Sequence, residues 1–501
     1  MNFIFKFFFA LSFISLSLQA QVSDTSNFNY SEIRGLLLDA ETKDPLPYAN
    51  IVIQRINKGT ISNEVGEFQM DTLNVLSTDS ISFQYIGYKT TTYLIKDVLK
   101  MKTVLLKEDI QNLNKVFVFG APPNPKDIIK KVVENRAKNY ANSRNKSNVF
   151  FRYRNTEDVD NLEMEYKKST ISVLDEKMIK ELERKTPRHS TSYTDLLADI
   201  YYSPIAIDST KYKLSPIKTV SLKEKEIADM KMIESVFKEV FADTKDDEYW
   251  KLKTGALSGE MTVDGVDSTD SDRPKNGRKT KSSFYPIKNA VKYGQLTDED
   301  DWEFLHATGK YKYKLVGGTN VGSEDVYIID FTPKSGGTFI GRAYISVETY
   351  ALIRADYAYD IGKTGTDIQI LGIGYRQDVF TGSVLFAKQD STYNLVYCSK
   401  KTGEKISIKR KFSILKKRER FMWDKTIKEI KLGINIKMNA QNSFELLVLN
   451  NEPISANSFK SFNQNKYHIV NYVDQFDDTL WEGYSIIQPT KKMREYKKRG
   501  E

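Results

Sequence analysis

The sequence predicts a mainly β protein with some helices (α+β), in which a small β-sandwich precedes a region of helices and antiparallel sheet. The chain of 501 residues contains 29 Tyr and 27 Phe, and aromatic side chains favour strands. Over residues 33–107, short apolar runs alternate with turn residues about every ten positions, which is typical of a sandwich. From Tyr311 onward, apolar and polar residues alternate through successive segments, which is typical of an antiparallel sheet with one buried face.

The start of the chain has the pattern of a secretory signal peptide. Lys6 provides the positive charge, residues 7–18 form an apolar core, and residues 18–20 resemble a cleavage site before Gln21. The apolar run is shorter than the roughly 20 residues that a membrane-spanning helix needs. No cysteine follows it as a lipid attachment site. We therefore expect export with removal of residues 1–20, rather than a retained anchor.

Composition limits the classes of partner. The single cysteine, Cys398, excludes a disulfide framework, so the fold depends on its hydrophobic core. The chain is basic, with 75 Lys and Arg against 66 Asp and Glu. Because an exported protein meets little nucleic acid, we expect no nucleic-acid partner and consider an anionic membrane surface instead. The densest basic runs are 409–420 and 491–500, and such runs are usually solvated faces.

Turn residues and alternation organise the front of the chain. Gly59 and Gly66 are expected in turns that need a positive φ, while Val52, Phe68 and Ile81 are expected to point inward. Nothing in this stretch requires a catalytic role. The expected strands cover residues 33–40, 48–54, 80–90 and 102–108, with a hairpin-like stretch at 57–68.

This stretch resembles a known family, the carboxypeptidase-like regulatory domain. The residues that carry the resemblance are Pro45, Pro47, Ala49, Gly59, Gly66, Phe68, Ile86, Gly87 and Tyr88. The resemblance covers Ile33 to about Glu108 and implies a transthyretin-like sandwich without catalytic activity of its own. Such domains occur in exported proteins of the Bacteroidetes and at the head of many of their TonB-dependent receptors.

The middle of the chain predicts helices. Asn124 as N-cap and Pro125 at the first position start a helix that runs to about residue 142. Its apolar stripe is predicted to pack into the core and comprises Ile128, Ile129, Val132, Val133 and Tyr140. This helix and residues 148–166 resemble a further Bacteroidetes envelope family of unknown function. Two more amphipathic helices are expected at 175–185 and 222–243.

A polar loop is expected over residues 263–283. Its four acids invite a calcium site, but the glycine and glutamate of an EF-hand loop are not at the required offsets, so a solvated loop is expected. The acids are Asp264, Asp267, Asp270 and Asp272.

The final region predicts one wide antiparallel sheet with a dry face, which helices must cover unless it forms a cavity. In one strand, five apolar side chains face one way, namely Ile430, Leu432, Ile434, Ile436 and Met438, while Lys431, Asn435 and Lys437 face the other. Residues 317–360 are similar to the lipoprotein-carrier sheet of the bacterial periplasm. The matching residues are Pro333, Gly341, Tyr344, Ile345, Tyr350 and Leu352. That similarity implies an incomplete barrel that cups acyl chains.

The predicted division of the chain follows from these patterns. It comprises a signal peptide (1–20), a regulatory-type sandwich (33–108), a linker (109–125), a mixed helical and β region (126–300), an antiparallel sheet region (301–490) and a basic tail (491–501).

The sequence predicts no catalytic, cofactor-binding or metal-binding residue. His189, His306 and His468 are far apart in sequence and form no zinc motif. In residues 255–259, Ser258 is one place too late for a serine nucleophile elbow. Residues 362–364 resemble the end of a phosphate loop, but Tyr357 stands where its first glycine belongs, so a hairpin turn is expected. The acids and aromatics of residues 297–304 suit a sugar site, but an acidic helix start explains them more simply.

We therefore expect a non-enzymatic, exported cell-envelope protein that serves as a binding or accessory component at the outer membrane, located in the periplasm or at the periplasmic face of that membrane. Its partner is an envelope protein, an outer-membrane transport component or an apolar ligand. One alternative is a periplasmic carrier of lipid or lipoprotein, which requires an open apolar groove beneath residues 311–438, not a sheet filled by Phe and Tyr. The other is a hydrolase acting on polysaccharide or peptide, which requires converging acids or a paired histidine.

Overall fold

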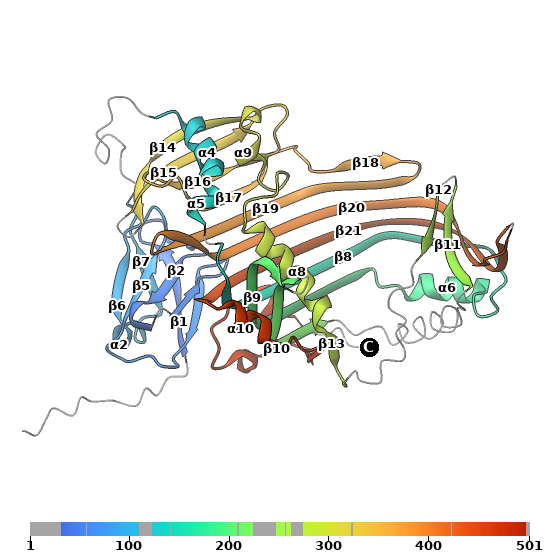
Figure 1. Ribbon diagram of the computed structural model, residues 1–501, viewed down its shortest axis with the longest axis horizontal. Helices are drawn as coiled ribbons and strands as arrows, with labels where there is room; N and C mark the ends of the chain where they lie inside the picture. The colour runs from blue at the N-terminus through green and yellow to red at the C-terminus, as the bar shows by residue number, and fades with distance from the viewer. Residues whose placement is uncertain are drawn as a thin grey trace, which may run out of the picture.

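The computed structural model describes most of the chain (Figure 1). The described residues are 32–56, 58–109, 123–140, 142–207, 210–223, 247–255, 257–261, 274–321, 324–421 and 423–496. The predicted signal peptide, most of the predicted linker and the four aspartates of the polar loop lie outside them. The helix expected at 222–243 also lies outside, apart from its first two residues, which end a strand.

The front of the chain folds as a β-sandwich of two small sheets. Ile33 and Phe68 on one sheet and Ile51 and Ile81 on the other are buried between them, because alternate side chains of each strand point inward. One sheet contains β4 (Glu67–Asp71), β1 (Glu32–Asp39) and β7 (Thr103–Leu106). The other contains β3 (Lys58–Ile61), β2 (Asn50–Ile53), β5 (Ser80–Gln84) and β6 (Thr91–Leu94), with η1 (Gln54–Ile56) and α2 (Ile95–Val98) beside it.

Of the details predicted for the sandwich, the turn conformation of Gly66 is confirmed, whereas the turn at Gly59 and the inward position of Val52 are wrong. Gly66 has a positive φ of 81°, and a Cβ there would lie 2.5 Å from the Leu37 carbonyl oxygen, so glycine is required. Gly59, in contrast, lies inside β3 without a positive φ. Val52 is partly exposed because its neighbours Ile51 and Ile53 take the inward positions.

The hairpin-like stretch at 57–68 is not a hairpin. β3 pairs with β2, whereas β4 pairs with β1, so the chain crosses from one sheet to the other between them. Turn residues mark a change of direction, but they do not say whether the next strand pairs locally or with a distant partner.

Two predicted helices are present, and the first has its predicted cap. α4 (Pro125–Glu134) begins where the Asn124 side chain accepts a hydrogen bond of 3.0 Å from the Lys126 amide. Its buried side chains are Ile128, Ile129 and Val132, and the short α5 (Arg136–Asn139) follows. α6 (Glu176–Lys185) is capped by Asp175. Among the described helices, none combines the length and apolar character that a membrane span requires.

All but two of the remaining described strands build one sheet of 14 strands, so the stretches 126–300 and 301–490 contribute to a single large sheet. Its main order is β14-β15-β16-β17-β19-β20-β21-β8-β9-β10-β23. The bounds are β8 (Asn145–Ser169), β9 (His189–Ile207), β10 (Thr210–Lys223), β14 (Tyr311–Val321), β15 (Glu324–Pro333), β16 (Phe339–Ser346), β17 (Leu352–Tyr359), β19 (Ile373–Gln389), β20 (Thr392–Arg418), β21 (Lys425–Pro453) and β23 (Asn471–Val473). β11 (Glu248–Thr254), β12 (Leu257–Met261) and β18 (Asp367–Ile370) extend it at the edges.

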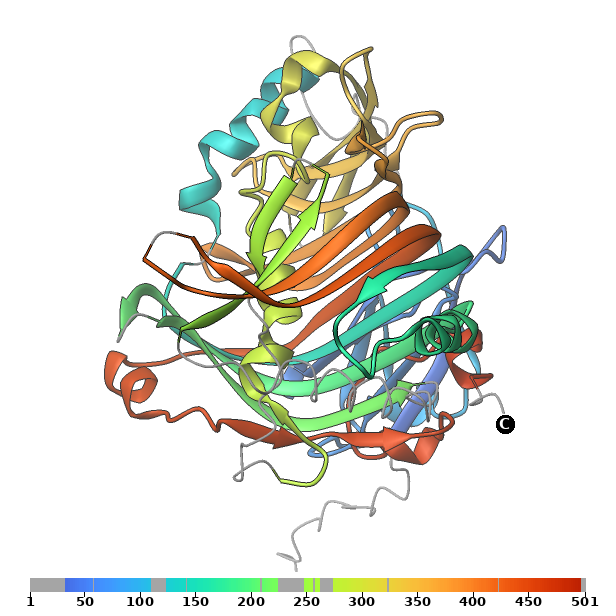
Figure 2. The ribbon, with the colours of Figure 1, turned by 90° about the vertical axis from the view of Figure 1, so that its right-hand side faces the viewer.

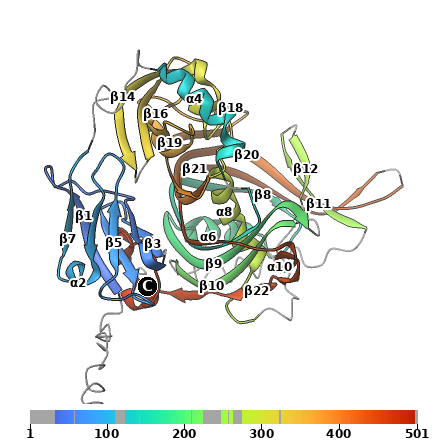
Figure 3. The same cartoon turned by 60° about the vertical axis from the view of Figure 1, so that its left-hand side comes forward.

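The sheet curls around α8 (Thr280–Tyr293) as an incomplete barrel (Figures 2 and 3). Residues 277–293, which contain β13 (Gly277–Lys279) and α8, include the end of the predicted polar loop, so that part of the loop prediction is wrong. The sequence does not predict α8, because Pro286 lies in its interior and its buried side chains include small or polar residues such as Thr280 and Ser283.

Consecutive residues near the start of β20 show that the sheet is covered on both faces there. The Cys398 thiol lies 3.5 Å from the Ala290 carbonyl oxygen of α8. The next residue back, Tyr397, points the other way and stacks on Tyr48 of the sandwich with ring centroids 4.9 Å apart. We call the face that carries Cys398 the α8 face and the opposite one the sandwich face. Burial raises the pKa of the Cys398 thiol, so this cysteine is a core residue and not a reactive one.

Aromatic side chains fill the α8 face over β15–β17 and the adjoining part of β19. Tyr293 of α8, Trp302, Tyr357 and Phe380 form a connected group, with Tyr293 and Trp302 centroids 4.9 Å apart. Phe304 of α9 (Glu303–His306) stacks on Phe331 at 4.0 Å. This half of the face is therefore a packed core.

The C-terminal strap, residues 485–496, lies between the sandwich and the sandwich face of the sheet. It includes α11 (Lys491–Arg494) and follows α10 (Ala456–Ser461), β22 (Tyr467–Ile469) and η3 (Asp478–Trp481). Ile487 and Met493 are buried, and Arg494 forms an ion pair of 3.3 Å with Glu67 of β4. The expectation that the tail is only a solvated face is therefore wrong for residues 491–496.

A buried charge pair anchors the strap to the sheet. Arg152 of β8 donates two hydrogen bonds of 2.8 and 2.7 Å to the Asp195 carboxylate of β9, and both side chains are at most 5% exposed. The remaining Nη1 of Arg152 donates to the Gln488 carbonyl oxygen at 3.1 Å. The Gln488 side chain in turn contacts Gln69 of β4. β8, β9 and the strap therefore meet at the guanidinium group of Arg152, and the Gln488 side chain extends this contact to the sandwich.

Replacing Arg152 tests this anchor. Arg152→Ala leaves the Asp195 carboxylate buried without its partner, so we expect the free energy of unfolding to fall by about 3–5 kcal/mol. The matched control is Arg342→Ala, which breaks the half-exposed pair with Asp330 and should cost less than about 1 kcal/mol. Urea denaturation followed by circular dichroism measures both. Equal losses for the two variants would contradict the anchoring role.

Glu445 of β21 is expected to make the stability of the fold depend on pH. Burial raises the pKa of its carboxyl group, and the nearby Arg152 only partly offsets this. The folded state therefore holds the Glu445 proton more tightly than the unfolded state. The contribution of protonated Glu445 to the free energy of unfolding is fully present below the unfolded pKa of about 4.3, and it is lost as the pH rises through the folded-state pKa.

We therefore expect Glu445→Gln to remove part of the loss of stability between about pH 4 and pH 8. The measurement is the difference in unfolding free energy between wild type and variant across that range. A variant that becomes progressively less stable than wild type as the pH rises would show that Glu445 is needed as a carboxylate.

Candidate binding site

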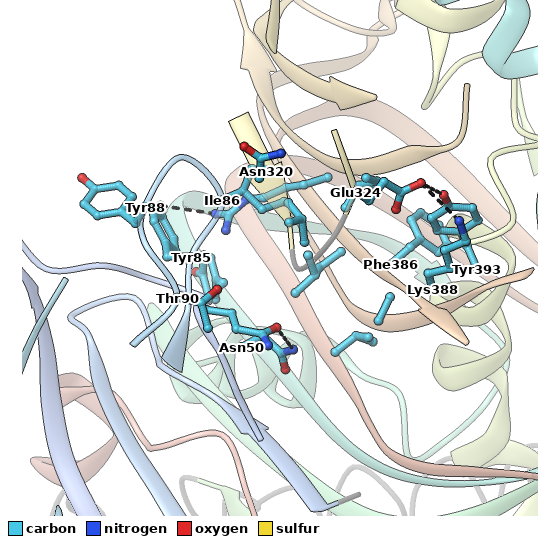
Figure 4. A pocket seen from close by; sticks show the side chains of 18 of the residues that line it. Asn50, Tyr85, Ile86, Tyr88, Thr90, Asn320, Glu324, Phe386, Lys388 and Tyr393 are labelled. Atoms are coloured by element: carbon cyan, nitrogen blue, oxygen red, sulfur yellow. Dashed lines mark hydrogen bonds and ion pairs between the residues drawn. The ribbon is translucent and has the colours of Figure 1, made fainter. Parts of the chain in front are cut away.

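A cavity of about 480 Å³ lies where the sandwich meets the sheet (Figure 4). We call it the interdomain cleft. One wall comes from β2, β5 and the residues that follow β5, and the other from the end of β14, the start of β15, β17, β19 and β20. Its lining includes the aromatic or aliphatic residues Tyr48, Tyr85, Ile86, Tyr88, Ile353, Leu385, Phe386 and Val396, and the polar residues Asn50, Gln84, Thr90 and Asn320.

Arg354 of β17 joins the two walls of the cleft. It is 5% exposed, and its Nε donates to the Asp356 carboxylate at 2.6 Å. Its guanidinium carbon lies 4.7 Å from the ring centroid of Tyr85 in the sandwich, a cation–π contact. Burial lowers the pKa of Arg354, but Asp356 and Tyr85 outweigh this and the pKa is raised overall, so the group stays charged.

Glu324, Tyr393 and Lys388 form the charged end of the cleft. The Glu324 Oε1 atom accepts hydrogen bonds from the Tyr393 hydroxyl and from Ser346, the latter at 2.6 Å, and lies 3.7 Å from the Lys388 ammonium. Burial and the bond to Glu324 raise the pKa of Tyr393 to about 12. Tyr393 is therefore a protonated donor near neutral pH, and it does not act as a base.

Two further cavities lie near the cleft. One of about 370 Å³ is lined by Tyr140, Tyr212 and Leu446, and it shares Phe386 and Tyr393 with the interdomain cleft. A third, of about 420 Å³, lies beside Tyr48 and Asp356. The aromatic residues of β19 and β20 therefore separate neighbouring hollows instead of enclosing one large chamber.

The α8 face changes character along the long strands. Beyond the aromatic core it carries aliphatic side chains that are partly exposed, until α6 covers its far end through Ile179, Ile430 and Leu432. We call this stretch the aliphatic floor; it comprises Ile406, Ile408, Ile436 and Met438, which pair across β20 and β21. Among the described residues, no hydrophobic cluster includes these four side chains.

This division bears on the groove expected beneath residues 311–438. Over β15–β17 the groove is filled by Phe, Tyr and Trp side chains, which counts against a carrier cavity there. The aliphatic floor, in contrast, retains a partly exposed apolar surface that no described aromatic side chain fills. Among the residues that resemble the lipoprotein-carrier sheet, Ile345 and Leu352 are fully buried in the core.

The three histidines do not come together as one site. His189 bonds the Asp158 carboxylate through Nδ1 at 2.6 Å and Thr191 through Nε2 at 3.3 Å, so it is a histidine with a partner. We call Asp158, His189 and Thr191 the Asp158–His189–Thr191 trio, and none of the three described cavities includes it. His306 bonds the Leu296 carbonyl oxygen at 3.0 Å, and His468 lies 3.4 Å from Ser283. Burial lowers the pKa of His468.

The remaining sequence candidates are structural. Ser258 is an exposed strand residue of β12, opposite Lys253. Gly362 has a φ of 76° and lies in a turn, although the strands on either side pair with β19 and not with each other. Within 297–304, Asp301 bonds Lys400 at 2.5 Å and Trp302 is fully buried, so these groups are engaged inside the fold.

Metal ligands are also absent from the part of the chain that the structure describes, where no group of three or more His, Cys, Asp or Glu is placed to hold an ion. The aspartates at 264, 267, 270 and 272 lie outside it.

The sequence analysis did not predict the polar residues of the cleft as site residues. Arg354 stands between Ile353 and Ala355 in an otherwise apolar strand, and a charge in such a position signals a buried ion pair. Its ion-pair partner Asp356 lies two positions along the same strand, whereas Tyr85, which links it to the sandwich, lies 269 positions away. Glu324 and Tyr393 likewise meet only because β15 and the β19–β20 turn are brought together by the sheet.

Comparison with known proteins confirms the predicted resemblance of the front of the chain. The family model of the CarboxypepD_reg-like domain matches residues 33–118. This match covers the whole sandwich. Comparison with the curated proteins finds no match.

Solved structures resemble the chain only distantly. A LolA superfamily protein from Nitrosomonas europaea is 8% identical, with 68% of this chain and 98% of that chain covered and a TM-score of 0.17. A putative outer membrane lipoprotein-sorting protein domain from Vibrio parahaemolyticus is 10% identical, with 67% and 97% covered and a TM-score of 0.20. The MucA/MucB complex of Pseudomonas aeruginosa gives 8% identity, 67% and 100% coverage and a TM-score of 0.18. Scores this low do not establish a shared fold.

Proposed function

We propose that this protein is a non-enzymatic, exported binding protein of the cell envelope, and that the interdomain cleft holds a segment of a partner polypeptide. The observation that carries the proposal is the cleft itself. It is preformed, it lies at a junction between two units, and it combines apolar walls with a few polar groups, as binding sites usually do.

The lining suits a polypeptide. Asn50, Gln84 and Asn320 offer amide groups that both donate and accept, which matches the alternating N–H and C=O groups of an extended peptide. Tyr85, Tyr88 and Phe386 offer flat apolar surfaces for its side chains. Asn50 and Gln84 already bond each other at 3.2 Å, so their amides are held in place before a ligand arrives.

A binding role, and not catalysis, agrees with the electrostatics of the cleft. Glu324 is engaged by Tyr393, Ser346 and Lys388, and the raised pKa of Tyr393 opposes proton abstraction. The Asp158–His189–Thr191 trio has the pairing that a hydrolase needs, but it lies outside the three described cavities. Catalysis requires a substrate to reach the reacting atoms, so the trio alone does not support a hydrolase.

The proposed location is the periplasmic side of the outer membrane. It is supported by the signal-peptide pattern of the first 20 residues and by the regulatory-type domain, which the resemblance places in exported proteins. The proposed partner class is an envelope protein or a component of an outer-membrane transporter.

A carrier of lipid or lipoprotein is the second candidate, and one specific observation favours it. The aliphatic floor presents Ile and Met side chains of paired strands on the inner face of a curved sheet. Such a surface suits an acyl chain, whereas the aromatic core beside it leaves no room for one.

Filling the cleft tests the first candidate. Ala387→Trp places a large side chain in the cleft lining, so an envelope protein that co-purifies with the wild type should be lost. The control is Ala456→Trp at the exposed start of α10, which should retain the partner. The measurement is quantitative mass spectrometry of proteins co-purified from envelope extracts. If no envelope protein co-purifies, or if both variants behave alike, the proposal is wrong.

Charging the aliphatic floor tests the carrier. Ile436→Lys places an ammonium on the inner face, so lipid that co-purifies with the wild type should decrease about tenfold, since burying a charge beside an acyl chain is costly. Asn435→Lys adds the same charge on the opposite face and is the control. Lipid mass spectrometry of the purified proteins measures the effect. An absence of acyl lipid from the wild type would reject this candidate.

A further inference from the structure

The hairpin that joins β20 and β21 ends in two exposed aromatic side chains. Phe421 is 105% exposed and Trp423 is 78% exposed. The other three tryptophans, Trp250, Trp302 and Trp481, are at most 3% exposed. The hairpin end projects beyond β11, β12 and α6 at the far end of the sheet (Figures 1 and 3). We call Phe421 and Trp423, with the cations beside them, the hairpin tip.

The tip is strongly basic. Residues 416–428 contain six Lys and Arg against two acids. The inner cations are neutralised, because Glu248 of β11 pairs with Lys416 at 2.7 Å and with Arg418 at 2.6 Å. Of the outer cations, Arg420 and Lys425 are exposed, and in the described part of the chain they form no ion pair. The charge that remains is therefore turned outward, around the two aromatic rings.

The tip is also braced from behind. β11 runs antiparallel to β20 with Glu248 opposite Arg418, and the Tyr249 hydroxyl donates to the Asp424 carboxylate at 2.5 Å. That bond lowers the pKa of Asp424, which keeps it ionised as an acceptor. The contacts hold the hairpin end in place while Phe421 and Trp423 remain outside the packed fold, so their exposure does not come from a lack of supporting structure.

Two kinds of partner could cover exposed aromatics, and the shape of the tip favours one. A specific protein interface buries upwards of about 1,000 Å² and needs a broad complementary surface. The tip is the narrow end of one hairpin and presents two rings with cations around them. Partitioning of aromatic rings into a bilayer interface needs no such surface, and anionic head groups complement the cations.

We propose that the hairpin tip docks this protein onto an anionic membrane surface. Phe421 and Trp423 enter the interfacial zone between head groups and acyl chains, while Arg420 and Lys425 bind the head groups. This interaction is peripheral and reversible, since two side chains enter and nothing spans the bilayer. It goes beyond the proposed binding of a partner in the interdomain cleft, and it does not depend on that site.

Vesicle flotation with the mature full-length chain tests the proposal. The probes are vesicles of phosphatidylcholine containing phosphatidylglycerol and vesicles of phosphatidylcholine alone. We expect binding to the anionic vesicles, weaker binding to the neutral ones, and loss of the difference at salt above about 0.1 M, where the Debye length falls below about 10 Å. Because Trp423 is the exposed tryptophan, its emission should shift to shorter wavelength on binding.

Variants separate the tip from the rest of the surface. Phe421→Ser with Trp423→Ser should lower the partition coefficient on the order of tenfold or more. The matched control is Ile361→Ser, which removes a 98% exposed side chain from a distant turn and should change nothing. Arg420→Glu with Lys425→Glu should remove the preference for anionic vesicles, whereas Lys491→Glu with Lys492→Glu in the tail should retain it.

Three results would overturn the proposal. The first is no binding of the wild type to anionic vesicles. The second is unchanged binding by the Phe421→Ser, Trp423→Ser variant, or loss of binding only when the tail lysines are replaced. The third is a change from dimer to monomer in the aromatic variant, measured by light scattering, because the rings would then be covered by a second copy of the chain.

Discussion

The guanidinium group of Arg152 is the point on which the arrangement of the molecule depends. A charge buried to this extent needs a paired opposite charge and hydrogen-bond partners, and here Asp195 and the Gln488 carbonyl accept a bond from each of its three nitrogen atoms. Gln488 belongs to the C-terminal strap, which also contacts the sandwich through Gln69 and Glu67. This one charge therefore fixes the positions of the sandwich, the sheet and the end of the chain relative to one another. The shape of the interdomain cleft depends on that arrangement.

The two faces of the sheet have taken different roles because strand side chains alternate. Tyr397 faces the sandwich and Cys398 faces α8, although they are neighbours in the chain. On the α8 face, aromatic residues complete a core over β15–β17, and partly exposed aliphatic side chains remain along the aliphatic floor. On the other face, the sandwich covers the sheet incompletely, and the gap that remains is the cleft beside Arg354. The two surfaces proposed for binding therefore lie where the close packing of the two faces ends.

The length of β20 separates the cleft from the hairpin tip. The strand runs from Thr392 to Arg418, with cleft residues Tyr393 and Val396 at its start and the tip just after its end. At about 3.3 Å per residue, these ends lie up to roughly 80 Å apart along the strand. If the tip rests on a membrane, the same strand presents the cleft well away from that surface, where a second protein can reach it.

The sequence alone determined what depends on neighbouring residues and on periodicity. Asn124 marks the start of α4, the spacing of turn residues over 33–107 predicts a sandwich, and the resemblance of residues 33–108 to a known family identifies it as regulatory-type. Alternation placed Ile430 and Leu432 on one face of a strand but did not say what covers that face. Only the tertiary structure decided that β3 and β4 belong to different sheets, that Arg354 meets Tyr85, and that Arg152 meets Gln488. The physical reason is that strand pairing and buried ion pairs join residues tens to hundreds of positions apart, and a local pattern does not name the distant partner.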